Sequence, residues 1–93
     1  MKSGDNLTYA LEVSAEFEKD YRKKCRDRGF KAALEKKTRQ VLENPSHYKP
    51  LQAPMHGIRR VHLTSSFVLL YEIVESSKTV RLLALKHHDE AYQ

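Results

Sequence analysis

A chain of 93 residues, 40% hydrophobic and 31% charged, can build one modest core and is too short for two. We therefore expect a single domain over residues 1–93. No apolar run approaches the roughly 20 residues that span a bilayer, and the polar N-terminus lacks the apolar core of a signal peptide, so we expect a cytoplasmic protein without membrane contact. The one cysteine, Cys25, cannot form an intrachain disulfide, which agrees with a reducing compartment.

The balance of charge favours a polyanionic partner. Seventeen Lys and Arg residues against twelve Asp and Glu residues give a net charge of +5 on this short chain. Many of the basic residues lie among acidic ones in the N-terminal half, and we expect these to be solvated helix faces. The excess charge is consistent with nucleic-acid binding but does not establish it.

A strand followed by a helix is predicted at the N-terminus. Apolar and polar residues alternate over residues 7–13, which predicts a strand with one buried face made of Leu7, Tyr9, Leu11 and Val13. Ser14 has the position of a helix N-cap, and apolar residues then recur every fourth position, as in an amphipathic helix: Phe17, Tyr21 and Cys25. Gly29 lies where a C-cap glycine of this helix is expected.

A second helix is predicted from about Phe30 to Glu43. Asn44-Pro45 should end it, because the residue before a proline avoids the α region. Its buried face should consist of Phe30, Ala33, Leu34, Val41 and Leu42. Joined at Gly29, the two helices would form an αα-hairpin. Residues 46–57 show no periodicity and contain two prolines, so we expect a surface loop.

Three further strands are predicted over residues 58–63, 67–74 and 79–85. The first alternates, which places Arg60 and His62 on the face opposite Val61 and Leu63. The second is almost continuously apolar, as expected of a central strand covered on both sides. The order β-α-α-β-β-β predicts an α+β fold in which a helical hairpin packs on a four-stranded, mostly antiparallel, curved sheet. The helices can cover one sheet face, which leaves the other as a platform for a substrate.

Ionisable residues and one aromatic ring follow the last strand, in residues 86–93. If this tail turns helically, His88 and Tyr92 are four residues apart and share a face. Chain ends are often frayed, so the tail alone does not indicate a site. A metal site is not expected, because His87, His88 and Asp89 are consecutive and lack the spacing typical of zinc ligands.

These features together resemble a known family. The element order, the size and the basic charge are similar to those of the RelE/ParE superfamily of toxins from toxin–antitoxin pairs. Residues 62–71, with a histidine before a turn, an aromatic and an apolar strand ending in tyrosine, resemble the YafQ-like mRNA interferase branch. Pro50-Leu51-Gln52 and the spacing of His88 and Tyr92 resemble it too. The resemblance spans residues 7–92.

The resemblance implies the toxin of a type II pair, a metal-independent endoribonuclease without cofactor. Such toxins enter the ribosome and cut mRNA in the A site by attack of a ribose 2′-OH on the adjacent phosphodiester, and a cognate antitoxin neutralises them. Its implied partners are the antitoxin, ribosomal RNA and mRNA. The catalytic histidines correspond to His62 and His88, and the C-terminal aromatic corresponds to Tyr92. Histidine suits proton transfer, since its ordinary pKa is about 6.5.

The match to the branch is incomplete. Ser66 stands where the branch has an acidic residue, Lys49 stands where it has a further histidine, and Val68 stands where RelE has a strand arginine. Candidate phosphate-binding residues are Lys49, Arg60, Arg81 and Lys86, of which Arg60 shares the face of His62. Two alternatives stay open: a ParE-like inhibitor of DNA gyrase, and a catalytically silent member that binds RNA or the antitoxin.

Overall fold

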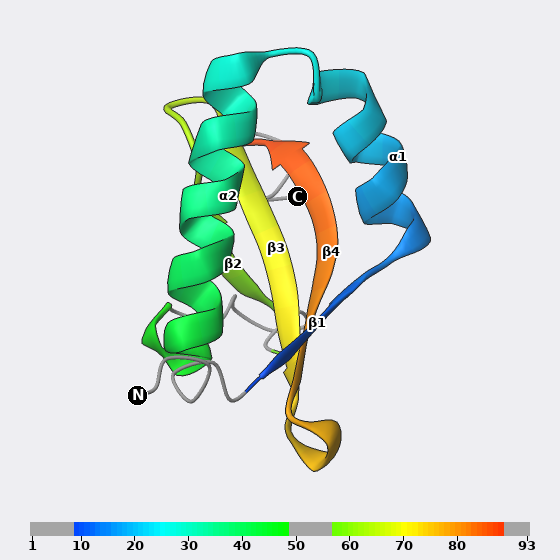
Figure 1. Ribbon diagram of the computed structural model, residues 1–93, viewed down its shortest axis with the longest axis vertical. Coiled ribbons are helices and arrows are strands. Elements are labelled where there is room, and N and C mark those ends of the chain that lie inside the picture. The colour runs from blue at the N-terminus through cyan, green and yellow to red at the C-terminus, as the bar shows by residue number, and fades with distance from the viewer. Residues whose placement is uncertain (1–8, 49–56, 89–93) are drawn as a thin grey trace.

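A computed structural model describes residues 9–48 and 57–88 of the chain. Its helices and strands follow the predicted order, with these bounds (Figure 1): β1 Ala10–Val13, α1 Ala15–Lys24, α2 Arg28–Glu43, β2 Arg59–His62, β3 Phe67–Val74 and β4 Thr79–His87. Short 3-10 turns cover Pro45–His47 and Glu75–Ser77. In the described ranges, no helix combines the length and the apolar character needed to cross a membrane.

The strands form one sheet in the order β1-β4-β3-β2. The edge strand β1 runs parallel to β4, whereas β4, β3 and β2 are antiparallel neighbours. α2 lies over the sheet and α1 lies beside β4, so the two helices form a hairpin on one side of the molecule (Figure 1). The predicted α+β architecture, a helical hairpin on a mostly antiparallel sheet, is therefore confirmed.

Side-chain caps set where the two helices begin. The Ser14 hydroxyl accepts a hydrogen bond from a backbone N–H in the first turn of α1, as predicted. Asp27 caps α2 in the same way, so α2 begins at Arg28. The prediction that Gly29 caps the end of α1 was wrong. α1 ends at Lys24 with Cys25 as its C-cap, and the cap by Asp27 places Gly29 in the first turn of α2.

The prediction of a buried face on the first strand was wrong for Leu11 and Val13, although Tyr9, just before β1, packs partly buried against the main core. All four residues of β1 are exposed, and Leu11 and Val13 retain 46% and 39% of their accessible surface. The alternation gives the strand correctly, because strands present side chains to alternate faces. The alternation does not predict the burial correctly, because a groove remains between the helices and this edge of the sheet. The side chains of Leu11 and Val13 line that groove.

Both faces of β3 are buried, as predicted for a central strand. On the side of the helices, Leu69 and Tyr71 belong to the main core, together with Phe30 and Val41 of α2. On the opposite side, Val68 belongs to a smaller cluster, completed by Leu70 and Ala84. The sheet thus has a helix-covered face and a second face, and His62 lies on the second because it is paired with Val68.

Tyr71 is a structural residue of the main core. It is fully buried, its hydroxyl donates to the carbonyl oxygen of Pro45, and burial raises its pKa to about 12.

We expect Tyr71→Phe to lower the free energy of unfolding by about 1–3 kcal/mol, because the Pro45 carbonyl loses its buried donor. Urea denaturation measures this. The control Tyr9→Phe removes a hydroxyl bonded to the exposed Glu75 and should change stability by less than about 0.5 kcal/mol. Equal stability of the two variants would contradict the role given to the Tyr71 hydroxyl.

Candidate active site

Two histidines from opposite ends of the C-terminal half meet at one end of the sheet. His62 is the last residue of β2, and His88 directly follows β4. Their imidazole ring centroids lie 5.5 Å apart, and the ring planes are inclined by 31°. The two predicted catalytic histidines are therefore in contact.

The turn between β2 and β3 holds both histidines. The hydroxyl oxygen of Thr64 accepts hydrogen bonds from the N–H groups of Ser66 and Phe67, which fixes the turn directly after His62. The carbonyl oxygen of Ser66 then accepts a hydrogen bond of 2.6 Å from the N–H of His88. Ser66, which stands where the resemblance implies an acidic side chain, thus acts here through its backbone.

The surroundings of His62 favour its neutral form. Its pKa is lowered from the ordinary value, first by burial and then by the positive charges of Arg60, His88 and Lys37. Arg60 lies two residues earlier on the same strand and therefore on the same sheet face, as predicted. Lys37 comes from α2 and was predicted only as a solvated helix residue. A neutral imidazole near pH 7 can accept a proton.

Lys86, a predicted phosphate ligand, is engaged with carboxylates in the structure. Its ammonium contacts Glu16 and lies 3.4 Å from a carboxylate oxygen of Asp20, both on α1. Its pKa is raised, mainly by the hydrogen bond to Glu16 and against the effect of burial. Lys86 lies two residues before His88, so it is close to the histidine pair, but its charge is balanced there.

Arg81, another predicted phosphate ligand, lies far from the histidines. It precedes His88 by seven positions on an extended strand, a separation of about 20 Å. Its guanidinium binds Glu12 at 2.8 Å and Glu72 at 2.7 Å, across the neighbouring strands, and these carboxylates raise its pKa. The structure does not bring Arg81 into the candidate site.

Other predicted site residues lie outside the part of the chain that the structure describes: Lys49 and Tyr92. Within residues 9–48 and 57–88, no three His, Cys, Asp or Glu side chains gather as a potential set of metal ligands. The roles predicted for Lys49 and Tyr92 remain predictions.

Phe67 contacts His87, the residue before His88, and was not predicted as part of the site. Its ring makes edge contacts with His87 and Phe30, at centroid distances of 5.5 and 5.6 Å, and the ammonium of Lys24 lies 4.2 Å above it. These contacts hold His87 toward the helices, whereas His88 contacts His62. The motif over residues 62–71 includes this aromatic residue, but its sequence position alone does not indicate these contacts.

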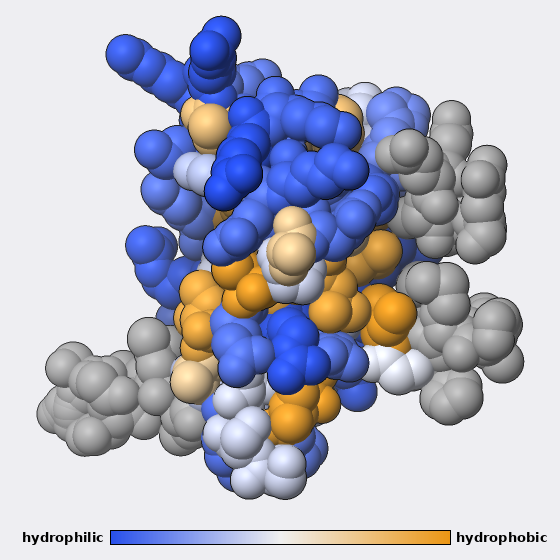
Figure 2. Space-filling view, turned by 90° about the vertical axis from the view of Figure 1, so that its right-hand side faces the viewer, coloured by the Kyte–Doolittle hydropathy of each residue, from blue (hydrophilic) through white to orange (hydrophobic). Residues whose placement is uncertain are grey.

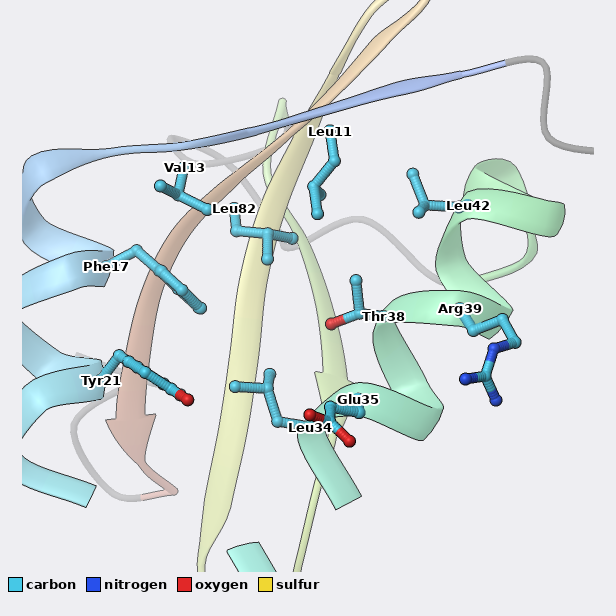
Figure 3. A pocket seen from close by; sticks show the side chains of 10 residues that line it. All are labelled: Leu11, Val13, Phe17, Tyr21, Leu34, Glu35, Thr38, Arg39, Leu42 and Leu82. Carbon is cyan, nitrogen blue, oxygen red and sulfur yellow. The ribbon is translucent and has the colours of Figure 1, made fainter. Parts of the chain in front are cut away.

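A second candidate site is an apolar groove of about 620 Å³ on the side of the helices. Figure 2, viewed from the side on which α1 and β1 lie in Figure 1, shows hydrophobic residues gathered below a more hydrophilic region. In Figure 3, side chains of β1, β4 and α1 face those of α2 across the groove. It is lined by Leu11, Val13, Phe17, Tyr21, Leu34, Glu35, Thr38, Arg39, Leu42 and Leu82. It is separate from the histidine pair, since His62 belongs to the other sheet face.

Comparisons with known proteins agree with this fold. Residues 11–92 match the family described as ParE toxin of the type II toxin–antitoxin system parDE. The chain is 36% identical over 86 residues to a putative toxin RelE4 of Methanocaldococcus jannaschii, a match covering 91% of this chain and 92% of that protein.

Solved structures show the same fold at lower sequence identity. The RelBE2 toxin–antitoxin complex of Mycobacterium tuberculosis contains a chain that matches with a TM-score of 0.74 at 23% identity, covering 88% of this chain and 93% of that one. A YafQ variant from E. coli matches with a TM-score of 0.72 at 20% identity, covering 91% of this chain and 99% of that one.

Proposed function

We propose a ribonuclease activity for this chain, which belongs to the ParE toxin family of type II toxin–antitoxin systems. In this proposal it is a cytoplasmic, metal-independent endoribonuclease that cleaves mRNA in the ribosomal A site and is neutralised by a cognate antitoxin. The observation that carries the proposal is the contact between His62 and His88. Two imidazoles side by side on an exposed end of a sheet supply an acid and a base, which RNA cleavage requires.

His62 serves as the base and His88 as the acid. The neutral His62 takes the proton of a ribose 2′-OH, and the 2′-oxygen attacks the adjacent phosphorus. The bond from phosphorus to the 5′-oxygen breaks, and protonated His88 gives its proton to that leaving oxygen. The products are a 2′,3′-cyclic phosphate and a 5′-hydroxyl end. The lowered pKa of His62 supports its role as the base.

Positive charge around the pair supports the same chemistry. Arg60 and Lys37 are close enough to His62 to lower its pKa, so they also oppose negative charge that grows on a phosphate there. Tyr92 and Lys49 are also proposed to contact the RNA. The basic excess of the chain supports binding to ribosomal RNA and mRNA.

The apolar groove is the proposed contact surface of the antitoxin. Exposed apolar patches on soluble proteins commonly bind partners, and Leu11 and Val13 are the large hydrophobic side chains most exposed among the described residues. The similar M. tuberculosis structure is a toxin–antitoxin complex, which supports a protein partner for this chain. Because the groove and the histidines lie on different faces, binding and catalysis should be separable by mutation.

Gyrase inhibition is the second candidate function, because the matching family is that of ParE toxins. A protein that only binds gyrase has no need of two imidazoles in contact, so the geometry favours the nuclease. A silent member that binds only RNA or the antitoxin is the third, since Ser66 replaces the family's acidic residue. In the structure, however, Ser66 contributes its carbonyl oxygen to the position of His88.

One experiment separates these functions. The purified toxin is added to a reconstituted translation system with ribosomes stalled at a defined codon, and the mRNA ends are mapped. We expect cleavage in the A-site codon, with cyclic phosphate ends, and none when ribosomes are omitted. A single 2′-deoxynucleotide at the cleavage position should abolish the cut, because the nucleophile is missing. If the normal mRNA is not cleaved, the nuclease proposal is wrong, and a gyrase supercoiling assay then decides between the other two.

A further inference from the structure

His88 directly follows the C-terminal half of β4, and α1 lies along one edge of this part of the strand. β1 accompanies β4 only as far as Leu82, where Val13 is its partner. Beyond that point α1 lies beside the strand in place of another strand (Figure 1). The edge of a strand presents backbone groups that need partners, so α1 must supply them.

A bulge changes the path of β4 at this same point. Leu82 pairs with Tyr71 and Ala84 pairs with Leu70, which leaves Leu83 without a counterpart on β3. Bulges bend a strand and redirect the side chains that follow. The hydroxyl of Ser14, at the start of α1, donates to the carbonyl oxygen of Leu83 at 2.7 Å. Ser14, the N-cap residue of α1, thus holds the bulge in place.

Asp20 holds the strand after the bulge. One oxygen of its carboxylate accepts a buried hydrogen bond of 3.0 Å from the N–H of Leu85. Asp20 is only 8% exposed and lies between Phe17 and Tyr21 on the inward side of α1. A buried carboxylate is costly unless its oxygens are bonded, so its presence here is explained by the bonds it makes. The same oxygen lies 3.4 Å from the ammonium of Lys86.

The two sides of this strand end are therefore fixed by different groups. Asp20 binds Leu85 from the side of α1, and the carbonyl oxygen of Ser66 binds the N–H of His88 from the side of β3. We propose that Asp20 is a positioning residue that, through the backbone of β4, sets His88 against His62. The inference rests on the proposed function for its effect on RNA cleavage, whereas the effect on the two rings is independent of it.

The variants Asp20→Ala and Asp20→Asn separate the hydrogen bond from the charge. Asparagine keeps a carbonyl oxygen for the N–H of Leu85 and removes only the negative charge, whereas alanine removes the acceptor. We expect Asp20→Ala to lower the rate constant of cleavage on saturating ribosomes by about 10- to 100-fold, since small displacements of reacting groups have effects of this size. Asp20→Asn should stay within about threefold of the wild type.

A second readout does not depend on activity. The ring protons of His62 and His88 should show a nuclear Overhauser effect in the wild-type protein and in Asp20→Asn, and lose it in Asp20→Ala. The matched control Glu16→Gln removes the other carboxylate partner of Lys86 without touching the backbone of β4, and should keep both the ring contact and the cleavage rate. If Asp20→Ala does not fold, Asp20→Glu replaces it, because its carboxylate is displaced by one methylene.

The outcomes are distinct. Loss of the ring contact in Asp20→Ala, with retention in Asp20→Asn, supports the positioning role even if the wild type cleaves no RNA. An unchanged ring contact in folded Asp20→Ala overturns it. Equal loss in Asp20→Asn also overturns it, because the charge beside Lys86 would then matter rather than the bond to Leu85.

Discussion

His62→Ala and His88→Ala should each lower the rate of mRNA cleavage by about 10²- to 10⁴-fold, the usual contribution of a positioned acid or base. The two rings lie 5.5 Å apart, so a single phosphodiester can contact both. The double variant should be little slower than either single variant, because acid and base act on the same step. The measurement is single-turnover cleavage of the stalled message on purified ribosomes.

The dependence of the cleavage rate on pH distinguishes the base, His62, from the acid, His88. Cleavage requires neutral His62, so the rate should fall as the pH drops through the pKa of His62. That pKa is lowered from 6.5, which places this acidic limb below pH 6.5. His62→Ala should remove the limb from the residual activity, while His88→Ala should leave it in place. His47→Ala is the matched control, since His47 lies in the turn after α2, and it should cleave at the wild-type rate. Wild-type rates in His62→Ala would contradict the assignment of the base.

The fold was largely predictable because its periodic patterns are strong. β3 has the predicted bounds, α2 has the predicted end at Glu43, and the central position of β3 follows from its continuous apolar run. Helix boundaries set by caps were harder to predict. Asp27 and Gly29 are both turn-favouring residues, and only the structure shows that the carboxylate of Asp27 decides where α2 begins.

The site was predictable only in part. The family resemblance paired His62 with His88, and the structure places them in contact. Asp20 has a sequence signal in retrospect, since it interrupts the apolar side of α1 between Phe17 and Tyr21. Its partner, the N–H of Leu85, has none, because a bulge in β4 and its neighbouring helix depend on tertiary packing.

The charged residues show why composition alone could not define the site. Arg81 and Lys86 lie on the same strand, and each is balanced by two carboxylates in the structure. Near His62, by contrast, positive charges lower the pKa. The net charge of +5 does not distinguish these environments. Only the register of the strands and the position of α1 do so.

The groove leads to the second prediction with a large expected effect. The double variant Leu11→Thr/Val13→Thr should weaken antitoxin binding by about 2 kcal/mol, or roughly 30-fold in Kd, because two half-exposed apolar side chains lose much of the apolar area they would bury. Threonine is β-branched, so β1 should be retained. The test uses the cognate antitoxin, and calorimetric titration measures its affinity.

Controls from both faces make this test specific. Val74→Thr makes the same chemical change at the end of β3, outside the groove, and should bind the antitoxin normally. The groove variant should still cleave mRNA at the wild-type rate, whereas His88→Ala should bind the antitoxin and fail to cleave. Normal antitoxin binding by a folded groove variant would show that the partner uses another surface. The expected result for the groove variant is that antitoxin binding is lost and cleavage is kept. This result follows because the groove and the histidine pair lie on the two faces of one sheet.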